Sequence, residues 1–170
     1  MFSLIVHIVP HASDMGLPQV TAAGVLSTIG GVSMIGRFVM GAANDKIGGK
    51  RSLISCFIVL LCGLVWFQFA CEAWMPFFFA VICGFAHGGF FTVVCPTMAE
   101  LFGTRSHGVL FGIVLFSGTI GGAAGPLLAG STFDVTGSYQ MVFLILAVLA
   151  VVGLVLIILL RPQRGAAAVR

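Results

Sequence analysis

The sequence predicts an all-α membrane protein with five full transmembrane helices and one partial helix. Hydrophobic residues make up 59% of its 170 residues and charged residues only 8%, against about a quarter in ordinary soluble domains. The few charges leave five long uncharged stretches, and each holds the roughly 20 residues that a helix needs to cross the hydrocarbon core. A soluble domain and a disordered chain are therefore excluded, and the length of the apolar runs favours helices over a barrel.

Six predicted segments follow one another along the chain. A partial span is expected at 2–12, and full spans at 18–43, 52–71, 75–98, 106–130 and 139–160. Pro18 and Pro76 each suit the first turn of a helix, because a proline there loses no helical hydrogen bond. We therefore expect one transmembrane bundle over residues 1–161, followed by a tail at 162–170.

The lysines and arginines gather on one predicted side of the membrane. That side receives the 44–51 loop, the 99–105 loop and the chain after Leu160, which together hold seven of the eight Lys and Arg residues. The opposite side holds acidic residues and no basic one. Because cytoplasmic loops carry an excess of Lys and Arg, we expect the 44–51 loop and the C-terminus to be cytoplasmic. The expected location is the plasma (cell inner) membrane.

Polar side chains single out the segments that are expected to line a cavity. They lie in the first, second, fourth and fifth segments, whereas the third and sixth are expected to support these. The polar residues are His7, Thr28, Ser33, Arg37, His87, Thr92, Ser117 and Thr119. Polar groups at membrane depth usually face protein or a water-filled space, which makes these segments the predicted lining.

Arg37, His87, His7 and Ser33 are the candidate substrate-binding residues. Arg37 is about six residues, roughly 9 Å, to the cytoplasmic side of its predicted helix centre. An arginine at a span centre costs at least ~2.5 kcal/mol, and somewhat less at this depth, unless it meets water, a carboxylate or an anionic substrate. It either snorkels or pairs with Asp45, or it binds a substrate anion. Packing and ligand binding both stay open for the two histidines, whose neutral imidazoles can take up a proton near physiological pH.

Metal binding, catalysis and nucleic-acid binding have little support in the sequence. His7 and His11 are four residues apart, as zinc ligands on a helix often are, and Asp14 could be a third ligand. Pro10 lies between the two histidines, so no metal is expected. The sequence has no HExxH, no GxSxG and no paired intramembrane aspartates, so neither an enzyme nor a cofactor is expected. A basic cluster with interleaved aromatic residues, typical of nucleic-acid binding, is also missing.

Grouped glycines predict close helix packing. Gly84 and Gly88 are four residues apart, and Gly121, Gly125 and Pro126 form a GxxxGP stretch. Small residues at this spacing let helix backbones approach each other. Because Pro126 cannot donate a helical hydrogen bond, a kink or hinge is also expected beside it.

The 36–51 segment carries the sharpest motif of the chain. Between two predicted spans, on the predicted cytoplasmic side, it places Gly41, Asp45, Lys46, Gly48, Lys50 and Arg51. Gly41 allows close helix contact, Asp45 can cap a helix or pair with a cation, and Gly48 can turn the chain tightly. An ordinary solvated basic turn is the alternative. The pattern resembles the GxxxDRxGRR loop of the major facilitator superfamily, with Lys46 as the first basic residue and Gly49 where a basic residue is usual.

This resemblance implies the C-terminal half of a transporter. In that superfamily the loop lies between the second and third helices and again between the eighth and ninth. The half-span and the five full spans then look like the end of the seventh helix through the twelfth, which form a C-terminal six-helix bundle. The seventh, eighth, tenth and eleventh helices are implied to line the cavity, and these are the segments that the polar residues indicate. The implied partners are a missing or separate N-terminal six-helix half and membrane lipid.

Within the superfamily, the sequence is similar to the monocarboxylate transporters and the oxalate/formate antiporters. The similarity is carried by residues 11–16, 36–37, 99–103 and 133–139. It implies secondary active transport of a small organic anion by alternating access, with Arg37 binding the carboxylate and His87 as the next ligand.

Two departures from these families bear on the substrate and on coupling. The 106–130 span has no lysine to pair with the arginine, so a monocarboxylate is favoured over a dicarboxylate. Ser33 stands where some carriers have an acidic residue, so a proton is an open partner, and symport and antiport both remain. The alternative is a truncated membrane fragment that does not transport.

Overall fold

The structure is a computed structural model that describes residues 5–6, 8, 18–69, 72, 74–103, 107–136 and 139–160. The long helices within these residues are α2 (Gln19–Ile47), α3 (Gly49–Phe67), α4 (Met75–Phe102), α5 (His107–Thr136) and α6 (Tyr139–Leu159). All five are long and apolar enough to cross a membrane. The predicted all-α membrane class with five full spans is therefore confirmed.

The predicted partial span is described only in part. Ile5, Val6 and Ile8 are helical, and Ile8 is fully buried. The remainder of the 2–12 segment, His7 included, lies outside the described residues. A sixth helix and a six-helix bundle therefore stay predictions.

A single residue, Gly48, separates α2 from α3. Its φ is 85°, a left-handed conformation that glycine adopts without the steric cost of a side chain. Its N–H donates to the carbonyl of Asn44 (2.9 Å), and its own carbonyl accepts the N–H of Ser52 (3.1 Å). Because the chain reverses in one residue, the charged residues expected in a loop are helical. For this reason α2 ends at Ile47 rather than at residue 43.

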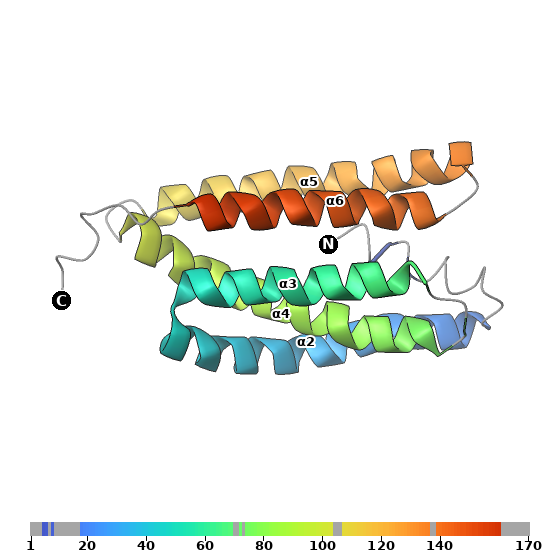
Figure 1. Ribbon diagram of the computed structural model, residues 1–170, viewed down its shortest axis with the longest axis horizontal. Coiled ribbons are helices and arrows are strands. Elements are labelled where there is room, and N and C mark those ends of the chain that lie inside the picture. Colours follow the sequence, from blue (N-terminus) through green and yellow to red (C-terminus); the bar gives the residue numbers. More distant parts are fainter. Residues whose placement is uncertain are drawn as a thin grey trace.

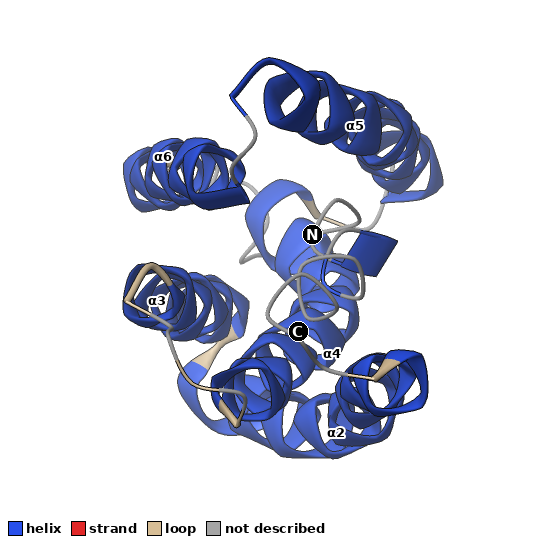
Figure 2. Cartoon of the chain, turned by 90° about the vertical axis from the view of Figure 1, so that its right-hand side faces the viewer, coloured by secondary structure: helices blue, strands red, loops and turns tan. Residues whose placement is uncertain are grey.

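The helices run along the long axis of the molecule (Figure 1). α2, α3 and α4 form one group, in which α2 packs along α4, while α6 lies beside α3 and α5 lies apart from both (Figure 2). α3 also contacts α6, whereas α5 makes few contacts with any helix. In the described part of the chain, Ala129 is the one buried residue of α5.

Two hydrophobic clusters form the core. The larger cluster draws residues from every described helix, and its aromatic centre is a stack of Phe67 on Phe79 at 4.2 Å, with Phe143 edge-on to Phe67 at 5.0 Å. The smaller cluster lies nearer the α2–α3 turn and consists of Met40, Leu53, Cys56 and Val93. Most buried residues thus lie on α2, α3 and α4, which form the closely packed part of the bundle.

Small residues bring the backbones of α2 and α4 together. A Cβ atom placed on Gly84 would lie 2.7 Å from the carbonyl oxygen of Ile29, and one on Gly88 would overlap the carbonyl of Ser33. Only glycine allows an approach this close. The packing role predicted for Gly84 and Gly88 is therefore confirmed, and this interface sets the register of α2 against α4.

Candidate substrate site and the loop motif

Helix α2 places Arg37 on an exposed face near the middle of its span. The preceding residue, Gly36, is buried against the backbone of Phe85 in α4, so Arg37 lies beside the α2–α4 interface. The 29 residues of α2 are centred on Ser33. Arg37 is therefore four residues, about 6 Å, from the helix centre. Because α2 is longer than the sequence predicted, Arg37 lies nearer the centre of its helix than expected.

This position bears on the two roles that the sequence left open for Arg37. The nearer end of α2 is at Ile47, ten residues or about 15 Å away, and the exposed Asp45 and Lys46 lie just before it. Arg37 and Asp45 both belong to the described residues, and no ion pair joins them. An exposed guanidinium within a membrane span depends on water or on a ligand for its counter-charge.

Helix α4 contributes His87 from close to its own midpoint. The side chain is half-buried, and its ring meets Phe91 edge-on with the centroids 5.0 Å apart. The next residue, Gly88, packs on Ser33 of α2, and this contact holds the two helices in register. Two of the four candidate residues, Arg37 and His87, therefore each lie beside the α2–α4 interface.

Ser33 lies near this place but is enclosed. It is 7% exposed, and its hydroxyl donates to the carbonyl of Gly30 at 2.7 Å. A ligand could therefore use the lone pairs of this hydroxyl and not its proton. The fourth candidate, His7, lies outside the described residues, so its role stays a prediction.

A carboxylate from α4 holds the loop motif. Oε2 of Glu100 accepts the N–H of Gly49 at 2.6 Å, at the N-terminus of α3, where a negative charge is favourable. A Cβ on Gly49 would lie 2.5 Å from Oγ1 of Thr97 and 2.8 Å from the carboxylate. The close approach of α4 therefore explains glycine at a position where the motif usually has a basic residue.

Sequence reasoning assigned no role to Glu100 beyond its place in the 99–103 stretch. The sequence does show that Glu100 is an acidic residue near the end of one predicted span. It lies on the side of the membrane where another predicted span begins. Such a carboxylate is well placed to cap a neighbouring helix N-terminus, but only the fold shows which helix it reaches.

The charged residues of the motif have different surroundings. Nζ of Lys50 donates to the carbonyls of Ile158 (2.8 Å) and Leu160 (2.5 Å), at the C-terminal end of α6, where a cation is favourable. The other three charged residues of the motif are exposed: Asp45, Lys46 and Arg51. The α2–α3 turn is thus tied to α4 through Glu100 and to α6 through Lys50.

Gly41 places the end of α2 close to α4. A Cβ on Gly41 would lie 3.4 Å from the methyl group of Thr92, which leaves room for little more than glycine or alanine. The hydroxyl of Thr92 donates to the carbonyl of Gly88 at 3.2 Å, so this polar residue is satisfied within its own helix.

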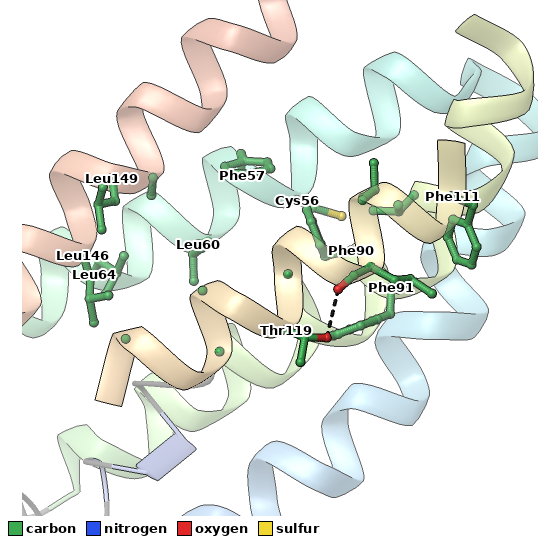
Figure 3. A pocket seen from close by; sticks show the side chains of 18 residues that line it. Cys56, Phe57, Leu60, Leu64, Phe90, Phe91, Phe111, Thr119, Leu146 and Leu149 are labelled. Atoms are coloured by element: carbon green, nitrogen blue, oxygen red, sulfur yellow. Dashed lines mark hydrogen bonds between the residues drawn. The ribbon is translucent and has the colours of Figure 1, made fainter. Parts of the chain in front are cut away.

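Gly121, Gly125 and Pro126 lie in a different part of the bundle. The two glycines line an apolar cavity of about 500 Å³ between α3, α4, α5 and α6 (Figure 3). The hydroxyl of Thr119 in this lining donates to the carbonyl of Leu115 at 3.0 Å, the dashed line in Figure 3. Neither Arg37 nor His87 lines this cavity. Pro126 lies inside the continuous helix α5, and a hinge there stays a prediction.

Metal-binding groups are few in the described part of the chain. It contains no cluster of three or more His, Cys, Asp or Glu side chains that could hold a metal ion. Sγ of Cys95 and Nε2 of His107 are 3.3 Å apart, a contact between α4 and α5. The other potential ligands named above, His7, His11 and Asp14, lie outside the described residues.

Comparison with known proteins defines the class to which this helical fold and loop motif belong. The sequence model of the Major Facilitator Superfamily matches residues 1–170. The chain therefore belongs to the Major Facilitator Superfamily, a class of transport proteins rather than of enzymes.

Among curated proteins, the chain is similar to several monocarboxylate transporters. It is 29% identical to monocarboxylate transporter 12 of Mus musculus over 146 residues, which cover 84% of this chain and 30% of that protein. The identity is also 29% to monocarboxylate transporter 13 of Rattus norvegicus (87% of this chain, 35% of that protein) and to monocarboxylate transporter 7 of Homo sapiens (95% and 32%). The chain thus spans about a third of the length of these relatives.

Proposed function

We propose that the chain is the C-terminal half of a secondary active transporter that moves a small monocarboxylate across the plasma membrane. An N-terminal six-helix half completes the carrier, and the two halves rock against each other about a site near the bilayer midplane. The α2–α3 turn and the C-terminus face the cytoplasm. Membership of the Major Facilitator Superfamily and similarity to monocarboxylate transporters support this proposal.

The observation that carries the proposal is the position of Arg37 and His87 beside one helix interface, each near the middle of its helix. Arg37 is exposed about 6 Å from the centre of α2, and His87 lies near the centre of α4, next to Gly88, which packs on Ser33 of α2. Ionisable groups inside membrane spans are costly and usually mark a ligand or ion pathway. An anion that enters between the two halves would find its counter-charge here.

The chemistry of the two side chains suits one carboxylate. A guanidinium presents parallel N–H donors that match the two carboxylate oxygens. His87 can donate a ring N–H to the same group, or take up a proton as the anion binds. Helix α5 carries no lysine or arginine, so a second carboxylate would lack a cation from that helix. Proton symport and anion exchange both fit this set of residues.

Uptake into proteoliposomes tests the proposal. The N-terminal half of one of the matched transporters is fused before Met1, and uptake of labelled lactate, a C3 monocarboxylate, is compared with that of labelled succinate, a C4 dicarboxylate. We expect lactate uptake, a KM at least tenfold higher for Arg37→Lys, and no uptake for Arg37→Gln. Ile35→Ala, an exposed change on the same helix, controls for damage to α2.

Two results would contradict the proposal. An unchanged KM in Arg37→Lys would show that the guanidinium does not bind the substrate. Absence of uptake by a correctly assembled pair, for every monocarboxylate supplied, would favour the transport-inactive fragment.

A further inference from the structure

A polar contact joins α4 to α5. Sγ of Cys95 and Nε2 of His107 are 3.3 Å apart, although the two residues are twelve positions apart in the chain and belong to different helices. Otherwise α5 makes few contacts with other helices. Neither side chain belongs to the candidate substrate site or to the loop motif, so the proposed function leaves this contact without a role.

The pair lies near an end of the bundle, where water can reach it. His107 is the first residue of α5, and Cys95 is seven residues, about 10 Å, before the end of α4 at Phe102. Figure 1 places these two helix ends at the same end of the bundle as the α2–α3 turn. Both side chains are half-buried, so an ion from the water can approach them without unfolding a helix.

Packing orients the imidazole of His107. Its ring lies parallel to that of Phe111, one turn later on α5, with the centroids 5.9 Å apart. Nδ1 is buried, whereas Nε2 faces the sulfur of Cys95. Nε2 is therefore the ring nitrogen that can bind an ion between the two helices.

The two ligand atoms suit a zinc ion. Thiolate sulfur and imidazole nitrogen are the ligands that Zn²⁺ prefers in proteins, and on a tetrahedral ion they lie about 3.6 Å apart. The observed 3.3 Å is slightly shorter, so a small side-chain rotation would admit the ion. A linear two-coordinate ion such as Cu(I) would separate the same atoms by more than about 4 Å, so the distance favours a tetrahedral ion.

We propose that Cys95 and His107 bind a Zn²⁺ ion that bridges α4 and α5. The ion displaces the thiol proton, which passes to water. The sulfur and Nε2 each donate an electron pair to the ion, and water molecules fill the two remaining positions.

The affinity of this site is expected to be lower than that of a structural zinc site. No group of three or more metal-binding side chains occurs among the described residues, and structural sites use four protein ligands. Nδ1 of His107 also has no hydrogen-bond partner in the described part of the chain, whereas a zinc-bound histidine usually donates its other N–H to an acceptor.

Zinc titration of the full chain in detergent tests the site. Calorimetry measures affinity and stoichiometry, with a phosphine reductant that keeps the thiols reduced. We expect one Zn²⁺ per chain, and at least tenfold weaker binding in Cys95→Ala and in His107→Ala. The matched controls are Cys62→Ala, which removes an exposed cysteine, and His11→Ala, and neither should change the affinity.

A second measurement leaves the chain unmodified, so it does not depend on whether a variant folds. Iodoacetamide alkylates the chain with and without Zn²⁺, and mass spectrometry quantifies the labelled peptides. Zinc should slow the alkylation of Cys95 at least tenfold, because the thiolate is the nucleophile and its electron pair is then held by the ion. Cys62 should react equally in both samples.

Three results would overturn the proposal. An unchanged affinity in His107→Ala would show that the thiol binds zinc without the histidine. One ion per two chains would place the site between copies of the chain. Equal alkylation of Cys95 with and without zinc would show that the ion does not reach the sulfur. None of these measurements involves uptake, so each outcome leaves the transport proposal where it stands.

Discussion

At the residue scale, the proposed function depends on Arg37 and His87. The sequence predicts an arginine inside a span, because a single charge interrupts an apolar run. It does not predict that Arg37 and His87 lie beside the same helix interface, because this depends on the packing of Gly88 on Ser33. Arg37 also lies nearer the centre of its helix than predicted, since α2 continues through residues that were expected to form a loop.

Replacement of His87 distinguishes packing from ligand binding. In the fused carrier, His87→Gln removes the imidazole ring. It keeps an N–H donor, the side-chain amide, at a different distance from the backbone. A hydrogen bond to a charged group is worth about 1.5–3 kcal/mol, so the KM for lactate should rise at least tenfold while the Tm changes little. Transport kinetics and thermal unfolding are measured together, with Val81→Ala on an exposed part of α4 as the control. A lower Tm with an unchanged KM would assign His87 to packing.

At the scale of elements, the α2–α4 interface and the α2–α3 turn organise the bundle. The spacing of Gly84 and Gly88 predicts close packing, but any neighbouring helix could have been the partner. The reversal at Gly48 was not predicted, because helix ends in a membrane protein are inferred from charges, and here the charged residues are helical. The bond between Glu100 and Gly49 joins residues far apart in the chain, so no local pattern shows it.

Two glycine-to-alanine changes should have opposite effects on stability. Gly88→Ala places a methyl group on the carbonyl of Ser33, and overpacking of this kind costs about 1–3 kcal/mol. Gly118→Ala meets nothing within 4 Å and should add about 0.5–1 kcal/mol, since alanine loses less backbone entropy in a helix. Thermal unfolding in detergent, followed by circular dichroism, compares the two. Equal effects would show that α2 and α4 do not pack as described.

Removal of the Glu100 carboxylate should loosen the α2–α3 turn. Glu100→Ala leaves the N–H of Gly49 without its acceptor, at a cost of about 1–3 kcal/mol. Glu100→Gln keeps an acceptor and loses the charge, so its cost should be smaller. Glu72→Gln, at an exposed position, is the matched control. If both Glu100 variants unfold at the wild-type temperature, the turn does not depend on this bond.

The whole molecule is a set of membrane-crossing helices whose connections fall on two sides. Long uncharged stretches were sufficient to predict the five full spans, because a span of this length leaves little choice of structure in a bilayer. Figure 1 places the α2–α3 turn and the end of α6 at the same end of the bundle, and Lys50 joins them. The side of the membrane that this end faces follows only from the distribution of Lys and Arg.

Labelling of single cysteines in intact cells tests whether the α2–α3 turn and the C-terminus lie on the same side of the membrane. An impermeant maleimide is applied to cysteine-free variants that carry Lys46→Cys, Glu72→Cys or Arg164→Cys. We expect Glu72→Cys to react from outside, and the other two variants to react only after the membrane is permeabilised. If Lys46→Cys and Arg164→Cys react from opposite faces, the number of crossings is wrong and the carrier proposal fails with it.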